Sequence, residues 1–170
     1  DMLMEGVHFD LTYNNMAQLG YKSAMVNLSD VFAMNGQPRQ LLVSIALGKR
    51  FKVEDLDDFY RGLHAACDQW DVDIVGGDTC PSLTGLAISI TCIGEADERD
   101  IVYRNGANET DLICVTGDLG AAYMGLQLLE REKSVYYQQL DKINDKIRKA
   151  NSEGNKALVK HLQDEGMKLT

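Results

Sequence analysis

The chain has 170 residues, of which 45% are hydrophobic and 25% charged, a composition typical of a globular protein with one domain or one domain and part of a second. Its net charge of −9 at pH 7 argues against a nucleic acid partner, because nucleic acids are held by clusters of lysine and arginine. No apolar run approaches the roughly 18 residues of a membrane span, and no signal-peptide pattern opens the sequence. We therefore expect a cytoplasmic protein with no membrane partner.

The cysteine pattern excludes the common zinc and redox motifs. Cys67, Cys80, Cys92 and Cys114 contain no Cys-x-x-Cys spacing. We expect them to be small buried hydrophobic residues in a reducing compartment.

The first two-thirds of the chain reads as an α+β domain. We predict a helix over 19–34, a strand over 40–47, a helix over 53–70, a short strand over 73–75 and a strand over 86–95. With an extended segment at the start, this order predicts a mixed or antiparallel sheet with helices on one face. In the second helix Leu56, Phe59, Leu63, Ala66 and Trp70 are expected to face inward.

The first helix carries two stripes. Three short polar side chains, those of Ser23, Asn27 and Asp30, follow one another at i+4 and i+3 spacing and project together. They predict a lined cavity, and a solvated face is the alternative. The opposite, apolar stripe consists of Tyr21, Ala24, Met25, Leu28, Val31 and Phe32.

The remainder predicts the incomplete start of a second α/β domain, with the boundary between residues 1–108 and 109–170. We expect a strand over 112–116 and a helix from the Gly117-Asp118-Leu119-Gly120 turn to about Glu132. Residues 134–152 form either a surface helix or a flexible insertion. Residues 155–165 predict a last helix, capped by Gly166.

Three carboxylates suggest a hard cation. Asp1 opens the chain, Asp30 lies in an apolar helical run where an unpaired charge would be costly to bury, and Asp78 follows Gly76-Gly77. Two carboxylates about 4 Å apart repel by roughly 4 kcal/mol at an effective dielectric near 20, so a cluster of three needs a cation. Mg²⁺ takes oxygen ligands and bridges to phosphates. The alternative for each Asp taken singly is a helix or strand cap.

Other residues fit phosphate chemistry less specifically. His8 lies in the Gly6-Val7-His8-Phe9 loop, Arg104 could clamp a phosphate, and Tyr60 could border a base or phosphate pocket. Gly76-Gly77 would let a phosphate approach the backbone, although an ordinary tight turn explains them equally well. Neither a P-loop nor a protein-kinase motif occurs, and His64 and His161 are expected to be solvated.

The ordered set of motifs resembles the thiamine-monophosphate kinase family, within the aminoimidazole ribonucleotide synthetase superfamily of ATP-binding proteins. The resemblance is continuous over residues 1–132 and resumes faintly at 157–170. The motifs are Asp1-x-x-x-Glu5-Gly6-x-His8-Phe9, Asn27-Leu28-Ser29-Asp30, Phe59-Tyr60-x-Gly62-Leu63, Val75-Gly76-Gly77-Asp78-Thr79, Arg104-x-Gly106-Ala107 and Val115-Thr116-Gly117-x-Leu119-Gly120.

The resemblance implies transfer of the γ-phosphate of ATP to thiamine monophosphate, without a covalent nucleophile from the protein. It implies a homodimer whose N-terminal domains pair their sheets. It assigns Mg²⁺ to Asp1, Asp30 and Asp78, with Asp30 contacting more than one ion. It assigns the thiamine phosphate to His8, and ATP to Tyr60, Gly77, Asp78 and Arg104.

Two elements of the family are missing from this sequence, a Gly-Asp-Asp-Ala element before Asp1 and a Ser-Asp-Gly element after Thr170. We therefore expect a fragment that lacks the first strand and is inactive alone. Two alternatives stay open. One is another member of the superfamily, such as selenophosphate synthetase or aminoimidazole ribonucleotide synthetase, although the His8-Phe9 loop and the Phe59-Tyr60 helix favour the thiamine enzyme. The other is a dimerisation and metal-binding module without catalysis.

Overall fold

A computed structural model describes residues 1–167 of the chain. The chain divides into two compact units, Asp1–Leu112 and Ile113–Thr170, which are described separately below. In the part of the chain that the structure describes, no helix is both long enough and apolar enough to cross a membrane.

The first unit contains the predicted mixed sheet. Its strands are β1 (Met2–Met4), β2 (Gln37–Leu47), β3 (Asp73–Pro81) and β4 (Ala87–Glu95), and they lie in the order β1-β4-β2-β3. β2 and β3 run parallel, whereas β4 pairs antiparallel with both β1 and β2. The predicted strands over 40–47 and 86–95 are therefore confirmed, and β2 begins three residues earlier than expected.

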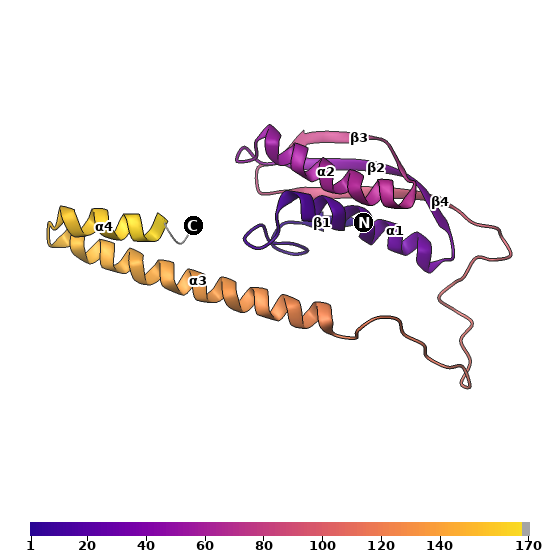
Figure 1. Ribbon diagram of the computed structural model, residues 1–170. Helices are drawn as coiled ribbons and strands as arrows, with labels where there is room; N and C mark the ends of the chain where they lie inside the picture. Colours follow the sequence, from indigo (N-terminus) through magenta and orange to yellow (C-terminus); the bar gives the residue numbers. More distant parts are fainter. Residues whose placement is uncertain (168–170) are drawn as a thin grey trace. The chain divides into compact units, whose positions relative to one another are not determined.

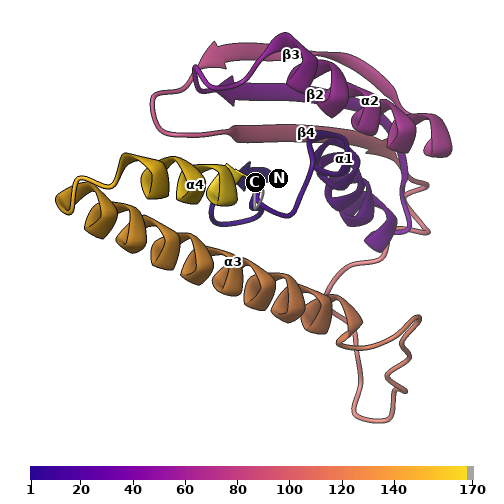
Figure 2. The ribbon, with the colours of Figure 1, turned by 60° about the vertical axis from the view of Figure 1, so that its left-hand side comes forward.

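Two helices, α1 (Met16–Ala33) and α2 (Val53–Trp70), pack against each other and lie along the sheet (Figures 1 and 2). α1 begins at a capping box, in which the Asn15 side chain accepts from the Gln18 backbone N–H and the Gln18 side chain accepts in return. A Cβ built on Gly20 would overlap the Phe59 carbonyl oxygen, and one built on Gly62 would overlap that of Ala17. The two helix backbones therefore touch at positions that only glycine can occupy.

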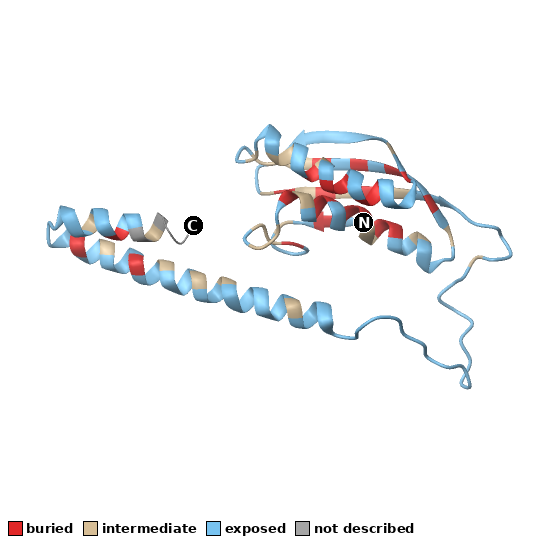
Figure 3. Ribbon diagram, viewed as in Figure 1, coloured by how far each residue is buried: buried red, intermediate tan, exposed pale blue. Residues whose placement is uncertain are grey.

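The core lies between these helices and one face of the sheet (Figure 3). From β4 it takes Ile88 and Ile90, together with Leu86 just before the strand. From the helices and β2 it takes chiefly Leu19, Ala24, Leu28, Leu41, Val43, Ile45, Phe59, Leu63 and Ala66.

The predicted inner faces of the helices are partly wrong. Trp70 is 41% exposed, and its ring packs on that of Phe32, 4.9 Å away between centroids, at the end of both helices. Tyr21 and Phe32 are also exposed, because they flank the buried face of α1. That face combines Ala24 and Leu28 of the apolar stripe with Leu19, Ser23 and Asn27. Tyr21, Phe32 and Trp70 thus lie beside the core, whereas Phe59 of α2 is fully buried in it.

The second unit contains two helices, α3 (Ala121–Ser152) and α4 (Lys156–Met167), which pack together. α3 runs on past Glu132, because the following residues include no proline or glycine before Gly154, so residues 134–152 are helical. The predicted strand over 112–116 is wrong. Leu112 and Ile113 are almost fully exposed, and no described strand pairs with that segment. Gly166 lies inside α4 and does not cap it.

Candidate functional site

β3 is an edge strand, and the glycine pair lies within it. The predicted short strand over 73–75 is therefore too short, since pairing with β2 continues as far as Pro81. The register shifts between Leu41 and Leu42, so that Val75 is bulged out. Gly77 has a φ of +154°, and a Cβ there would overlap the Val43 carbonyl oxygen. Glycine at this position lets the bulged strand stay close to β2.

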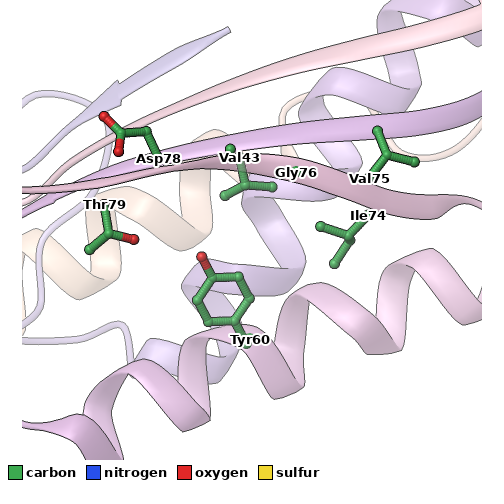
Figure 4. Close-up of a pocket in the computed structure, with 8 residues that line it drawn as sticks. Val43, Tyr60, Ile74, Val75, Gly76, Asp78 and Thr79 are labelled. Carbon is green, nitrogen blue, oxygen red and sulfur yellow. The ribbon is translucent and has the colours of Figure 1, made fainter.

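A pocket of about 480 Å³, here called the edge pocket, follows this strand (Figure 4). In Figure 4 the Tyr60 hydroxyl, carried by α2, points toward β3, and Thr79 lies on the same side of the strand. The Asp78 carboxylate points to the other side. Tyr60, Gly77 and Asp78, three of the four residues predicted to contact ATP, all line the edge pocket. Its lining comprises Val43, Tyr60, Ile74, Val75, Gly76, Gly77, Asp78 and Thr79.

The fourth predicted ATP residue lies in a second pocket, here called the helix-end pocket, of about 820 Å³. The Val102 N–H donates to the Met34 carbonyl at 3.1 Å, which holds the segment after β4 against the end of α1. Asp30 and Arg104 thus line the same cavity. The complete lining is Asp30, Ala33, Met34, Val102, Tyr103, Arg104 and Asn105.

The polar stripe of α1, formed by Ser23, Asn27 and Asp30, is buried at its first two residues and exposed at the third. Ser23 and Asn27 are buried, as a lined cavity would require, and the Ser23 hydroxyl has no hydrogen-bond partner among the described residues. Asp30 is exposed, so the expectation that it occupies a costly apolar setting is wrong. Asp30 lies in the last turn of α1, beyond Asn27 and Leu28, the last buried residues of the helix.

Asp1 lies at the opposite edge of the sheet from Asp78. Its amino nitrogen donates to Asn27 Oδ1 at 2.7 Å and to the Ile90 carbonyl at 2.8 Å. The ladder then runs from Ile90 through Val43 to Gly77. Three strand spacings of about 4.8 Å separate Asp1 from Gly77, or roughly 14 Å. Asp1 and Asp78 therefore cannot share a ligand ion directly within one copy of this fold.

The acidic residues give no ready-made metal centre. Within residues 1–167, no group of three or more His, Cys, Asp and Glu side chains is arranged to hold a metal ion. The donor types suit Mg²⁺, and Asp30 and Asp78 each bring a carboxylate to one pocket, but the three aspartates do not converge.

His8 lies in an exposed loop that is held by hydrogen bonds. Its Nδ1 accepts from the Met4 N–H at 3.0 Å, and its carbonyl accepts from Lys22 Nζ at 2.6 Å. At the start of the loop, Glu5 forms an ion pair with Arg50 and accepts from the Leu86 N–H. Sequence reasoning missed Lys22 and Arg50, because both contacts join segments that are distant in the chain and neither residue belongs to a quoted motif.

The cysteines separate into two classes, and all four are free. Burial, followed by the nearby Asp68 carboxylate, raises the pKa of Cys67 to about 11. Burial also raises the pKa of Cys92. Cys80 and Cys114 are exposed, so the prediction that all four are buried is wrong for these two. His64 and His161 are exposed, as expected.

Comparison with known proteins identifies a family and several relatives that this chain resembles. Residues 1–96 match the family described as AIR synthase related protein, N-terminal domain. Thiamine-monophosphate kinase of Bacillus subtilis is 35% identical over 132 residues, which cover 78% of this chain and 41% of that protein. The chain thus spans about two-fifths of the length of the curated relatives it matches.

Solved structures with a similar fold include thiamine-monophosphate kinases. The structure of AaThiL complexed with AMPPCP and TMP is 38% identical, with a TM-score of 0.72 over 78% of this chain and 41% of that one. The thiamine-monophosphate kinase from Stenotrophomonas maltophilia is 32% identical, with a TM-score of 0.72 over 78% of this chain and 40% of that one. The match over residues 1–96 covers more than half of the sequence, and the chain belongs to the family of AIR synthase related proteins through their N-terminal domain.

Proposed function

We propose that the protein containing this chain transfers the γ-phosphate of ATP to thiamine monophosphate, giving thiamine diphosphate and ADP. The observation that carries the proposal is the edge pocket, in which Tyr60, Gly77 and Asp78 lie together. A relative with 38% identity and the same fold is described as complexed with AMPPCP and TMP, the first of which is an ATP analogue. The free cysteines fit a cytoplasmic reaction.

The chemistry requires no nucleophile from the protein. An oxygen of the thiamine phosphate attacks the γ-phosphorus, a new P–O bond forms, and the bond to the β-phosphate bridge breaks as ADP leaves. The protein's contribution is to position two polyanions and to neutralise their charge. Arg104 in the helix-end pocket and the backbone along the β3 edge are suited to ATP, and His8 is assigned to the acceptor phosphate.

The direct test is a coupled assay of the intact protein with thiamine monophosphate, ATP and Mg²⁺. We expect thiamine diphosphate to form. Absence of this product, under conditions in which selenide or another acceptor is phosphorylated, would overturn the choice of substrate in favour of a different member of the superfamily. Loss of activity on removing Mg²⁺ with a chelator, restored by adding it back, would support the metal assignment.

Asp30 provides the sharpest test of a metal-ligand role, because it lines the helix-end pocket together with Arg104. Because Asp30 is exposed, Asp30→Asn should leave the melting temperature without Mg²⁺ unchanged. It should raise the Mg²⁺ concentration needed for half-maximal rate and lower kcat by about 100-fold, equivalent to roughly 2.7 kcal/mol for one lost anionic ligand. Asp57→Asn on α2 is the matched control, since Asp57 is also exposed and lines neither pocket. A near-normal kcat for Asp30→Asn would remove Asp30 from the site.

We further propose that the protein is a homodimer whose sheets pair through the face opposite the helices. That face exposes large apolar side chains on three strands, Met2, Met4, Leu42 and Ile93. Such side chains are uncommon on a free sheet surface. Sedimentation of the intact protein should give twice the monomer mass, and Leu42→Lys should shift it to monomer. A monomeric wild-type protein would contradict the proposal.

A further inference from the structure

The backbone and side chain of His8 make three hydrogen bonds, although the residue is exposed. Its N–H donates to the Met4 carbonyl at 2.9 Å, and its Nδ1 accepts from the Met4 N–H at 3.0 Å. Its own carbonyl accepts from Lys22 Nζ at 2.6 Å, the shorter distance typical of a charged donor. A loop residue with all of these groups engaged has its side-chain direction fixed.

The contact with Met4 also fixes the tautomer. An imidazole nitrogen that accepts a hydrogen bond carries a lone pair, so in neutral His8 the proton is on Nε2. No hydrogen bond to Nε2 occurs among the described residues, and the side chain is exposed. His8 therefore presents a single N–H donor to the outside of the loop.

The two ends of the loop are anchored to different elements. At the start, the Glu5 N–H donates to the Leu86 carbonyl, while Glu5 Oε2 accepts from the Leu86 N–H and the other carboxylate oxygen pairs with Arg50. At the end, Lys22 of α1 donates to the His8 carbonyl. Between these anchors Gly6 turns the chain at a φ of +76°. Met4 thus contacts the imidazole of His8 itself, and Lys22 holds the His8 carbonyl.

We propose that Lys22 is a positioning residue, which clamps the carbonyl of His8 so that a neutral Nε2–H donor is held toward the phosphate of the acceptor substrate. The inference rests on the proposed function for the identity of that substrate. The ammonium group also places a positive charge at the carbonyl of His8 in a chain of net charge −9, which favours approach of an anion to this loop. Lys22 acts through His8 and does not take part in the bond changes.

The first experiment reads the tautomer without any ligand or activity. Two-bond ¹H–¹⁵N correlation spectra of the 170-residue chain report which imidazole nitrogen carries the proton, and for His8 they should show protonated Nε2 and unprotonated Nδ1. Lys22→Met keeps most of the length of the side chain and removes the donor to the His8 carbonyl. If Lys22 holds His8 in the position from which Nδ1 reaches the Met4 N–H, that contact is then lost for part of the time, and His8 should give an averaged mixture of both tautomers. Lys22→Arg should restore the single form, and Lys142→Met, an exposed lysine on α3, should behave as wild type. A wild-type Nδ1–H tautomer, or an unchanged spectrum in Lys22→Met, would overturn the proposal.

The second experiment measures the intact protein. Lys22→Met should raise KM for thiamine monophosphate on the order of tenfold, as expected for losing a well-placed hydrogen bond to a charged group. KM for ATP and kcat should change by less than about twofold. An equal rise in both KM values would show a general structural effect and count against the proposal. If the wild-type protein does not phosphorylate thiamine monophosphate at all, the proposed function fails, while the NMR result still decides whether Lys22 fixes His8.

Discussion

The two units of this chain bury their apolar side chains to very different extents. In Asp1–Leu112, a sheet and two helices enclose a continuous core in which Leu28, Phe59 and Leu63 are fully buried. In Ile113–Thr170, the buried side chains among the described residues are those of Ile143, Ala150 and Leu162. Both units contain long helices with apolar stripes, so helical periodicity alone does not distinguish them.

The difference follows from the number of layers. A helix hides one stripe, and a stable core needs a second layer of comparable area to cover it. In the first unit α1 and α2 face a four-stranded sheet, whereas in the second unit the 32-residue α3 is covered only in part by the 12-residue α4. Leu126, Leu128 and Leu129 of α3 consequently remain exposed. The same type of substitution should therefore change the stability of the two units by different amounts, or in opposite directions.

The largest contrast is expected from replacing glycine by alanine within a helix. Gly62→Ala places a methyl group into the Ala17 carbonyl and should destabilise the first unit by about 3 kcal/mol or more, because α1 and α2 must separate. Gly125→Ala on α3 meets no atom within 4 Å and should stabilise its helix by roughly 0.5–1 kcal/mol. The fluorescence of Trp70 reports urea unfolding of the first unit, and circular dichroism reports both units.

Equal effects of the two substitutions would contradict this contrast. If Gly62→Ala unfolded near the wild-type midpoint, the close approach of the helices would not exist in solution. Gly20→Ala offers an independent check, since its methyl group would overlap the Phe59 carbonyl at the same crossing.

A smaller contrast is expected from the helix caps. The Asn15 side chain accepts from the Gln18 N–H at 2.8 Å, and the Asn155 side chain accepts from the Leu158 N–H at 3.1 Å. Asn15→Ala should lower the free energy of unfolding of the first unit by about 1 kcal/mol, because α1 forms part of a cooperative core. Asn155→Ala should reduce the helical circular dichroism signal and leave the Trp70 transition unchanged. A shift of that transition by Asn155→Ala would show that the units unfold together.

The same contrast explains how much of the fold could be predicted from the sequence. Where apolar periodicity met a covering layer, prediction was accurate, as for the helix at Val53–Trp70 and the strand at 86–95. Where the structure of a segment depends on a pairing partner that is distant in sequence, the prediction was not accurate. β3 continues past Gly76-Gly77 because β2 pairs with it, and residues 112–116 form no strand because no described strand does.

The candidate site follows a similar rule. Three residues that the family motifs assign to ATP, Tyr60, Gly77 and Asp78, share the edge pocket. The fourth, Arg104, lies instead with Asp30 in the helix-end pocket. The assumption that Asp1 would join Asp78 had no physical basis in spacing along the chain, and the strand order places them at opposite edges. Their roles as ligands stay predictions.

The smallest effect concerns Cys67, in the core of the first unit, compared with the exposed Cys114 in the second. The pKa of Cys67 is about 11 in the folded state, against an ordinary value of 9.0. Because the unfolded state then loses the thiol proton at lower pH, the contribution of Cys67 to stability is fully present below pH 9 and is lost as the pH rises toward 11.

At pH 9.5 the loss amounts to less than about 1 kcal/mol, since only part of the titration has occurred. Urea unfolding followed by Trp70 at pH 8 and 9.5 should show this decrease in the wild-type chain. Cys67→Ala should lower stability at both pH values but give a shallower pH dependence, whereas Cys114→Ala should leave the slope as in wild type. If the free energy of unfolding had the same pH dependence in all three proteins, the Cys67 thiol would not be shielded from water. The packing of α1 on α2 would then be looser than the close backbone contacts at Gly20 and Gly62 indicate.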